Sequence, residues 1–519
     1  MLGSKGHLGN VELYKRRRLL RLSAPIKSPS EASTSLTCSE NSRRDGKRHW
    51  KMQKTNKFSL LLFLLQLSTM LSVAYLSVSV VEGRKGYGRR SRAPKHGGGS
   101  SKKSPDQDHF GSSAPSPAPQ YSTIFDVLSY GAKGDGVSDD SKAFVAAWKA
   151  ACEVPWATVE VPSEFKFLIR PITLVGPCMP HLLLKIDGTI LAPPNPSGWS
   201  KSSLFQWINF KWLHDFTIQG SGTVDGQGSF WWNLSPIQCT KKKSKHFPTM
   251  KPTVRYIFPR VSNTRFFGSY NVTVRDISII NSPQCHLKFD SSTKVQVENL
   301  TISSPQSSPN TDGIHLQDAR DVMIVYRYRP DALAFTFITL TADQAMVLGG
   351  LGKDNSLACV SNVTVENVNV QNALSGVRIK TWQGGLGSVR DVSFSNVQVT
   401  DVQIPIVIDQ YYCDKRVCKN QTHAVAISGI KYTQITGTYS LQPIHLACSD
   451  DIPCTDVDLI DVQLQPMRDS RRWCPRQALC WNSYGKSHAP LVPSSIDCLQ
   501  RATGFLIDTL KRSHDQDLC

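Results

Sequence analysis

The sequence lacks the residue clusters that bind metals, phosphates or nucleic acids. His286, His315, His423 and His445 stand singly, without a partner at ligand spacing, so we expect no metal site and no cofactor. The string GSGTVDGQG is not followed by Lys-Ser or Lys-Thr, so it predicts a turn and not a phosphate-binding loop. No nucleic-acid-binding motif accompanies the excess of basic residues.

Acidic residues are few at the N-terminus compared with basic ones. The chain has 519 residues and a formal net charge of +19. Residues 1–120 hold 22 lysines and arginines against 7 aspartates and glutamates, whereas residues 121–519 hold 38 against 34. The basic character therefore belongs to the N-terminal region. It favours a solvated or wall-binding tail over nucleic-acid binding.

The long stretch Phe58–Val81 has no charged residue and follows three closely spaced lysines. A basic region followed by an apolar one is typical of a secretory signal, which we assign to residues 52–83. The length also fits the membrane-spanning helix of an anchored structural protein. Because Ser and Thr dilute the run after Leu67, a signal is favoured and no stable membrane span is expected.

The segments on either side of the signal region contain little that could form a core. Since signals begin a chain, residues 1–51, which end just before Met52, are interpreted as a non-native or disordered extension. Residues 84–120 form a basic linker rich in Gly, Ser and Pro, a composition that favours an extended or disordered chain. The folded domain is predicted to span residues 121–519.

The cysteines and the glycosylation sequons fit secretion. Of 14 cysteines, all except Cys38 follow the apolar stretch, which leaves an odd number and predicts a free thiol or a lost partner. Each of five asparagines has Ser or Thr two residues later: Asn233, Asn271, Asn299, Asn362 and Asn420. Asn271 and Asn362 fit equally well as residues that end the turns of a repeat.

The folded domain begins with a strand, a glycine-rich turn and an amphipathic helix, in the segment FDVLSYGAKGDGVSDDSKAFVAAWKAAC. Before the helix, Ser138, Asp139 and Asp140 offer N-cap oxygens and first-turn carboxylates. The residues expected to face the core recur at helical spacing: Phe144, Val145, Trp148 and Cys152. We expect this helix to cap the N-terminal end of a sheet structure and to protect its strand edge.

Similar strand units recur along the rest of the domain. They are NVTVRDISI from Asn271, KVQVENLTI from Lys294, NVTVENVNV from Asn362, DVSFSNVQV from Asp391 and TDVDLIDVQL from Thr455. Alternating apolar residues in units this similar, with no long helices between them, predict an all-β parallel β-helix in which each coil packs on the next. A β-sandwich also shows alternation, but not such similar units.

Two charged motifs occupy strand ends or faces. Asn310-Thr311-Asp312 precedes Gly313 at a bend, and Arg378 and Lys380 alternate along one strand and so share a face. Taken alone, an Asp-Gly pair usually indicates a turn. Two cations on one face of a strand usually indicate an edge exposed to solvent. Together they favour a carboxylate beside a cationic clamp, which suits a sugar polymer that carries carboxylates.

The chain resembles the plant polygalacturonases over roughly Tyr121 to Cys498. The resemblance rests on the strings FDVLSYGAKGDGVSDDSKAF, FTIQGSGTVDGQG, YNVTVRDISIINSPQCHLKFD, SPNTDGIH, GVRIKTWQGG and IPIVIDQYYCD. It implies a right-handed, single-stranded, pectin-lyase-like parallel β-helix. It also implies a secreted, monomeric cell-wall enzyme whose partner is pectic galacturonan and which hydrolyses α-1,4 linkages with inversion.

The resemblance also implies roles for individual residues. Asp312 corresponds to a water-activating base. Arg378 and Lys380 correspond to the Arg-Ile-Lys motif that grips the uronate carboxylate. Asn310 and Tyr412 are further candidates for substrate binding.

The central catalytic segment departs from the family pattern. The family's Gly-Asp-Asp and Gly-His-Gly motifs are absent between Asp312 and Arg378, where Asp331 and Asp343 are the carboxylates of the altered stretch and neither forms an Asp-Asp pair. The codons for Arg329 to Val347 can be chosen so that reading one nucleotide earlier gives QTGCSGIYIHNVNCGPGHG. That string resembles the family, and it places Ala345, Met346 and Val347 over the missing Gly-His-Gly.

Two alternatives to an active hydrolase follow. One is a faulty gene model that lacks both motifs, with residues 326–348 read out of frame and residues 254–264 taken from a retained intron. The other is a catalytically impaired wall protein that binds pectin through Arg378 and Lys380. The second requires the damaged coil to fold, although Arg327, Arg329 and Pro330 fall where inward strand positions are expected.

Overall fold

The computed structural model describes residues 123–199, 206–233, 262–306, 308–327, 338–413, 418, 420–467, 475–501 and 518–519. They belong to the second of two compact units, Ser113–Cys519. The predicted extension 1–51, the signal region 52–83 and the linker 84–120 lie outside the described residues. Within the ranges above, no helix is both long enough and apolar enough to cross a membrane.

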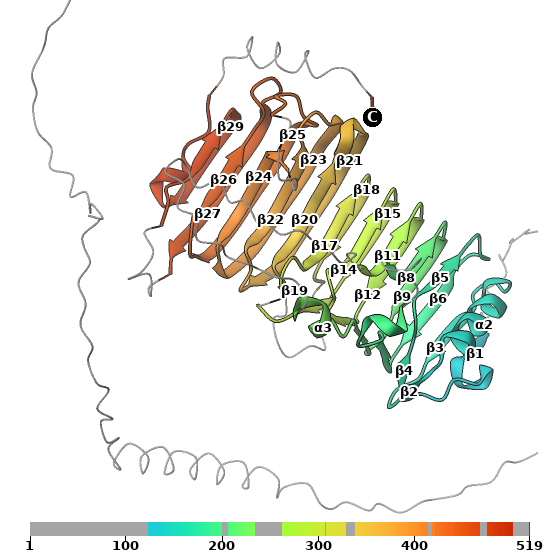
Figure 1. The fold of residues 1–519 in the computed structure, drawn as a ribbon. Coiled ribbons are helices and arrows are strands. Elements are labelled where there is room, and N and C mark those ends of the chain that lie inside the picture. The colour runs from blue at the N-terminus through green and yellow to red at the C-terminus, as the bar shows by residue number, and fades with distance from the viewer. Residues whose placement is uncertain are drawn as a thin grey trace, which may run out of the picture. The chain divides into compact units, whose positions relative to one another are not determined.

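The described residues fold into a right-handed parallel β-helix (Figure 1). The repeats predicted the parallel β-helix, and the family resemblance implied its right hand. Sheet B contains β5 Ile172–Val175, β8 Gln206–Lys211, β11 Ser262–Phe267, β14 Cys285–Asp290, β17 Asp312–Gln317, β20 Gln344–Leu351, β22 Ser375–Trp382, β24 Ile404–Tyr412, β26 Ile444–Ala447 and β28 Leu479–Trp481. Its strands pair in parallel in this order. A sandwich of antiparallel sheets is therefore excluded.

Sheet A forms the remaining walls of the coils. It contains β1 Ile124–Asp126, β2 Asp135–Asp139, β3 Thr158–Val161, β4 Lys166–Leu168, β6 Leu182–Ile186, β7 Thr189–Leu191, β9 His214–Gln219, β10 Thr223–Asp225, β12 Tyr270–Arg275, β13 Ser278–Ile280, β15 Thr293–Glu298, β16 Thr301–Ser303, β18 Arg320–Val325, β19 Ile338–Thr341, β21 Leu357–Gln371, β23 Leu386–Val402, β25 Ala426–Tyr439, β27 Cys454–Pro466 and β29 Ser483–Val492. The short helical elements are η1 Val127–Tyr130, α2 Ser141–Cys152, η2 Pro196–Gly198, α3 Ser229–Asn233, η4 Lys353–Asn355 and η5 Ser494–Ile496.

The repeat units stack in register along sheet A. One interior position of each coil aligns through successive strands in the order Val272, Val295, Val322, Val363, Val392, Ile430 and Val457. All of these side chains are buried. At about 25 cal/mol per Å² of buried apolar surface, such ladders are the main stabilising contribution of the coils.

The asparagines Asn271 and Asn362 do end repeat turns. Their φ angles of 55° and 53° lie in the left-handed region, which asparagine tolerates better than most residues. The Asn362 side-chain amide donates to the Asp321 carboxylate at 2.7 Å, and that of Asn271 donates to Asp215 at 2.5 Å. These hydrogen bonds connect neighbouring coils at the same bend.

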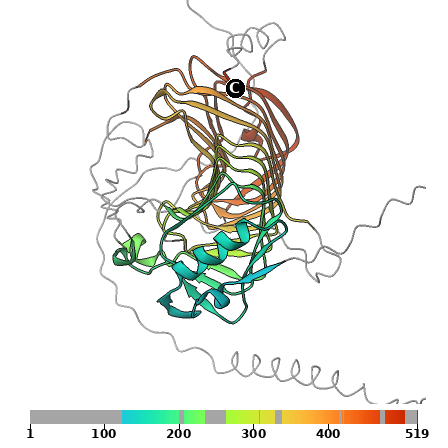
Figure 2. The same cartoon turned by 90° about the vertical axis from the view of Figure 1, so that its right-hand side faces the viewer.

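The helix α2 lies at the N-terminal end of the β-helix (Figure 2). The ring of Trp148 packs on Phe210 and Phe216, with centroids 5.8 and 5.3 Å apart. The predicted cap is partly wrong, because the first turn contains no acidic residue and Asp140 accepts hydrogen bonds from the N–H groups of residues 133 and 134 instead. Asp139 accepts from the Ser141 N–H.

Most cysteines of the described residues form disulfides. They join Cys152 to Cys178, Cys359 to Cys519, Cys413 to Cys418, Cys448 to Cys454 and Cys480 to Cys498. The predicted free thiol is Cys285, which is buried at the start of β14, and burial raises its pKa. Cys239 and Cys474 lie outside the described residues.

The altered stretch continues the coil where it is described. β19 pairs with β16 and β21, and β20 pairs with β17 and β22, in parallel register. The expectation that Arg327 points inward is wrong, because β18 ends at Val325 and the Arg327 guanidinium forms an exposed ion pair with Glu298 at 2.8 Å. Arg329 and Pro330 lie outside the described residues.

The segment interpreted as intron-derived also contributes to the fold. Ser262–Thr264 form the first half of β11, in register with β8 and β14. Residues 254–261 lie outside the described part of the chain. The last three residues of the segment therefore contribute to the β-helix, whatever the origin of their codons, and its interpretation as a retained intron stays a prediction.

Replacing Tyr432 by phenylalanine is expected to stabilise the protein by about 1 kcal/mol. The Tyr432 ring stacks on Phe394 at 5.3 Å, and its hydroxyl is fully buried without a hydrogen-bond partner in the described residues. Phenylalanine keeps the stack and removes the desolvated hydroxyl. Guanidinium unfolding measures the change, with Tyr484→Phe, at a partly exposed tyrosine, as the control. A loss of stability in Tyr432→Phe would show that the hydroxyl is hydrogen-bonded.

Candidate active site

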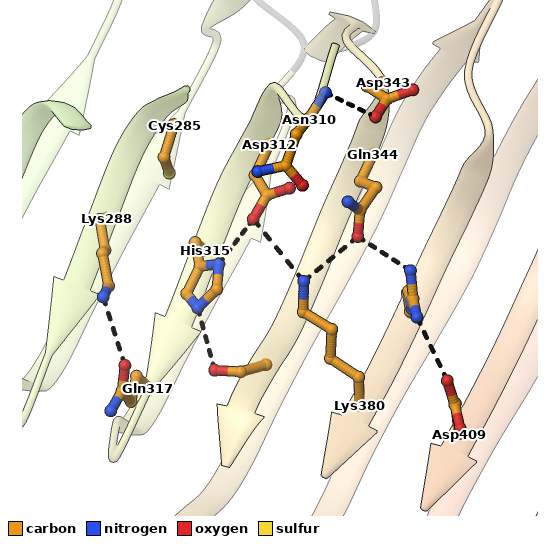
Figure 3. Close-up of polar contacts among 12 residues, drawn as sticks. Cys285, Lys288, Asn310, Asp312, His315, Gln317, Asp343, Gln344, Lys380 and Asp409 are labelled. Carbon is orange, nitrogen blue, oxygen red and sulfur yellow. Dashed lines mark hydrogen bonds and ion pairs between the residues drawn. The ribbon is translucent and has the colours of Figure 1, made fainter. Parts of the chain in front are cut away.

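The two charged motifs meet on the outer face of sheet B (Figure 3). Asp312 is the first residue of β17, and Arg378 and Lys380 lie on β22. Only β20 separates the two strands, and its first residue, Gln344, aligns with Asp312. The β-helix thus brings together motifs that are far apart in the sequence.

The two cations of β22 are held by oxygen atoms on three strands. The Lys380 ammonium lies 4.0 Å from Asp312 Oδ2 and 3.3 Å from Gln344 Oε1. The Arg378 guanidinium donates to the same Gln344 oxygen at 3.1 Å and to Asp409 Oδ2, on β24, at 3.3 Å. Lys380 is buried, which fixes its position more tightly than that of a surface lysine.

Asp312 is a buried carboxylate that stays ionised. Burial by itself raises its pKa, but the charge of Lys380 and the hydrogen bond from His315 outweigh burial and lower the pKa to about 2. The Asp312 Oδ1 atom has no hydrogen-bond partner among the described residues. One oxygen of this charged carboxylate is therefore buried and not hydrogen-bonded to another described group.

His315 belongs to this cluster, although the sequence indicated only an isolated histidine. Its Nδ1 lies 2.8 Å from Asp312 Oδ2, and its Nε2 lies 2.9 Å from the Gly349 carbonyl oxygen. Burial lowers the pKa of His315, while the bond to Asp312 opposes that shift. The sequence offered one indication of this contact, the i, i+3 spacing of Asp312 and His315. In a regular strand residues at that spacing point to opposite faces, so the pattern did not predict that they meet.

The predicted binding residues Tyr412 and Asn310 also lie at the cluster. The Tyr412 ring centroid is 5.3 Å from Lys380 Nζ and 5.7 Å from the Arg378 guanidinium carbon. The edge of Trp382, which the sequence analysis did not single out, packs on Tyr412 at 5.2 Å. The Asn310 side chain lies beside Asp312 in Figure 3.

The strand β20 supplies no acidic group to the outer face. Met346 aligns with Ile314 and Val377 in the interior, and Val347 lies between His315 and Arg378 in the outward-facing row. All three residues predicted to stand over the missing Gly-His-Gly motif, Ala345, Met346 and Val347, are buried and apolar.

The bend that leads into β20 supplies the carboxyl group of Asp343. Its Oδ2 accepts a hydrogen bond from the Asn310 backbone N–H at 2.8 Å. Burial, above all, raises the pKa of Asp343 to about 7, and the charge of Asp312 adds to this effect. Asp343 is not part of an adjacent Asp-Asp pair, as the sequence shows, and Asp312 on the neighbouring coil is close enough for its charge to affect the Asp343 carboxyl.

Comparisons with known proteins agree with this geometry. The sequence model of "Glycosyl hydrolases family 28" matches residues 152–480. A probable polygalacturonase of Arabidopsis thaliana is 36% identical over 75% of this chain and 87% of its own length. A polygalacturonase of Chamaecyparis obtusa is 37% identical over 66% of this chain and 67% of its own length.

One solved structure supports the fold. An endo-xylogalacturonan hydrolase from Aspergillus tubingensis superposes with a TM-score of 0.51 at 18% identity, covering 71% of this chain and 99% of that one. Where side chains are described here, no group of three His, Cys, Asp or Glu residues is arranged to bind a metal ion.

Proposed function

The chain belongs to family 28 of the glycosyl hydrolases, and from that premise we propose that it hydrolyses α-1,4-linked galacturonan of pectin with inversion. The observation that supports this substrate most strongly is the pair of cations on β22, Arg378 and Lys380, beside the ionised Asp312. Guanidinium and ammonium groups bind a uronate carboxylate through charge-assisted hydrogen bonds.

In this proposal Asp312 activates the water that attacks the anomeric carbon. A base must be ionised at the working pH, and the low pKa of Asp312 meets that condition. Arg378 and Lys380 hold the uronate ring next to it, and Asn310 and Tyr412 line the same site. Inversion also needs a second carboxyl group as the general acid. The acid and the base are then ~6.5–9.5 Å apart, because a water must fit between the sugar and the base.

A second candidate function is binding of pectin without hydrolysis. It is favoured by β20, whose outward-facing residues at the site are apolar and whose first residue is the neutral Gln344. The cationic residues alone would then retain the polymer.

Incubation of the purified protein with polygalacturonate separates the two functions. We expect release of reducing ends, with the new anomeric centre in the β configuration by NMR, and weaker activity on fully methyl-esterified pectin because esters remove the uronate charge. Retention on the polymer at low salt without release of reducing ends would leave only the binding function. If the protein is not retained on the polymer and releases no reducing ends, both functions are contradicted.

We also propose that the protein is secreted to the cell wall as a monomer. The disulfides support an oxidising compartment, and the uncharged stretch Phe58–Val81 supports a signal. N-terminal sequencing of secreted material tests this, and a mature chain that still contains Phe58–Val81 would contradict cleavage of a signal.

A further inference from the structure

We infer that Asp343 is the proton donor of this site, in place of the Gly-Asp-Asp motif that is absent between Asp312 and Arg378; this inference rests on the proposed hydrolysis. Asp343 is the residue directly before β20, on the coil that stacks on Asp312. In Figure 3 it lies at the same end of the strands as Asp312 and Asn310.

The position of Asp343 is fixed from both neighbouring coils. On one side its backbone N–H donates to Thr311 Oγ1 at 3.1 Å, and its carboxyl oxygen accepts from the Asn310 N–H at 2.8 Å. On the other side its carbonyl oxygen accepts from the Leu374 N–H at 2.7 Å. A group bonded in this way keeps its place when a substrate binds.

The stacking of the coils gives a spacing that an inverting reaction can use. Neighbouring strands lie about 4.8 Å apart, and Asp343 is offset by one residue from Gln344, which aligns with Asp312. Two carboxyl groups placed in this way, on separate side chains, can reach the ~6.5–9.5 Å separation that leaves room for a water.

Burial and the neighbouring charges give the carboxyl groups of Asp343 and Asp312 different pKa values. Asp312, from β17, disfavours ionisation of Asp343, whereas Arg378 and Lys380, from β22, favour it, as does the Asn310 N–H. Burial exceeds these effects, so the pKa of Asp343 is about 7 while that of Asp312 is about 2. Between these values one carboxyl group is protonated and the other ionised, as general acid and general base require.

Other described carboxylates near the cluster are held by cations. Asp409 is paired with Arg378, and Asp290 with Lys288 and Arg265. The Asp343 carboxyl has no ion pair within the described ranges, and its hydrogen bond to Asn310 uses only Oδ2. Its Oδ1 atom can therefore carry the proton.

The reaction moves one proton from each of two donors, Asp343 and the attacking water. The Asp343 proton moves to the glycosidic oxygen as the bond between that oxygen and the anomeric carbon breaks. The water oxygen bonds to the anomeric carbon from the opposite face and gives its proton to Asp312. Asp343 is then ionised and Asp312 protonated, and exchange with solvent restores both.

The variant Asp343→Asn tests the inference with two substrates. On polygalacturonate we expect kcat to fall by ~10²–10⁴-fold, because the leaving sugar alkoxide must depart unprotonated. On 4-nitrophenyl α-galacturonide, whose leaving group needs no proton, we expect a loss of less than about tenfold. The control is Asp321→Asn, an exposed aspartate on β18 that hydrogen-bonds Asn362, which should leave both activities unchanged.

The pH profile of the unaltered protein provides a measurement that does not depend on folding of the variant. Asp343 is active as an acid only when protonated, so kcat/KM on polygalacturonate should fall as pH rises through about 7. The aryl substrate should lack this alkaline limb.

The outcomes distinguish the inference from the proposed function. Unchanged hydrolysis of polygalacturonate by Asp343→Asn would overturn the inference and leave the function intact. An unaltered protein that cleaves only the aryl substrate would overturn the inference and also the proposed hydrolysis of the polymer, because the base and the cations would then act without a proton donor. An unaltered protein that cleaves neither substrate would overturn both.

Discussion

Replacing Asp312 by asparagine is expected to lower kcat for polygalacturonate by ~10²–10⁴-fold while the protein still binds the polymer. Asparagine cannot take the proton of the attacking water. Arg378 and Lys380 remain in place, since both also donate to Gln344. Rates of reducing-end release and retention on immobilised polygalacturonate measure the two effects separately.

Asp312→Asn should also abolish cleavage of 4-nitrophenyl α-galacturonide, because a better leaving group does not replace the base. That outcome separates Asp312 from Asp343, whose loss the aryl substrate should tolerate. Thermal unfolding, with Asp321→Asn as the matched control, shows whether a variant is folded. A folded Asp312→Asn protein that cleaves either substrate at an undiminished rate would contradict the role of base.

The fold could be predicted because equivalent residues of successive repeats pack on one another. Val272 and Val295 occupy the same position of their units and stack on each other. The strand β25 has the same left-handed bends as the predicted unit of β23, with Gly429 and Gln434 aligned with Asp391 and Asn396. Its unit was not predicted as a repeat because the residues at these two bends differ in type, although the backbone conformation is the same.

The candidate site was predicted only in part, for a different reason. Asp312, Arg378 and Lys380 are found in short motifs, and these motifs indicate a carboxylate beside a cationic clamp. Asp343 belongs to no motif, and its pKa depends on which coil packs against it. Because β20 pairs directly with β17, Asp343 becomes a neighbour of Asp312. The sequence of β17 or of β20 alone does not predict that these two strands pair.

Replacing Lys380 by methionine is expected to raise KM for polygalacturonate about 10–100-fold, which corresponds to the loss of one charge-assisted hydrogen bond of ~1.5–3 kcal/mol. Methionine keeps the length of the side chain and removes its charge. The matched control is Lys288→Met, a lysine on β14 of the same sheet, whose ammonium pairs with Asp290 at 3.1 Å. Steady-state kinetics at fixed ionic strength measure the difference.

Lys380→Met should also move the acid limb of the pH profile to higher pH. The charge of Lys380 is the largest effect that keeps the pKa of Asp312 near 2, against the opposing effect of burial. Asp312 acts as a base only when ionised, so activity present above its pKa is lost as pH falls through it. In Lys380→Met the rate should therefore decline as pH falls from ~5 to ~3, near the ordinary pKa of a carboxyl group. Over the same pH range the rate of Lys288→Met should match that of the unaltered protein. An acid limb that stays in place would show that Lys380 binds substrate without maintaining the charge of Asp312.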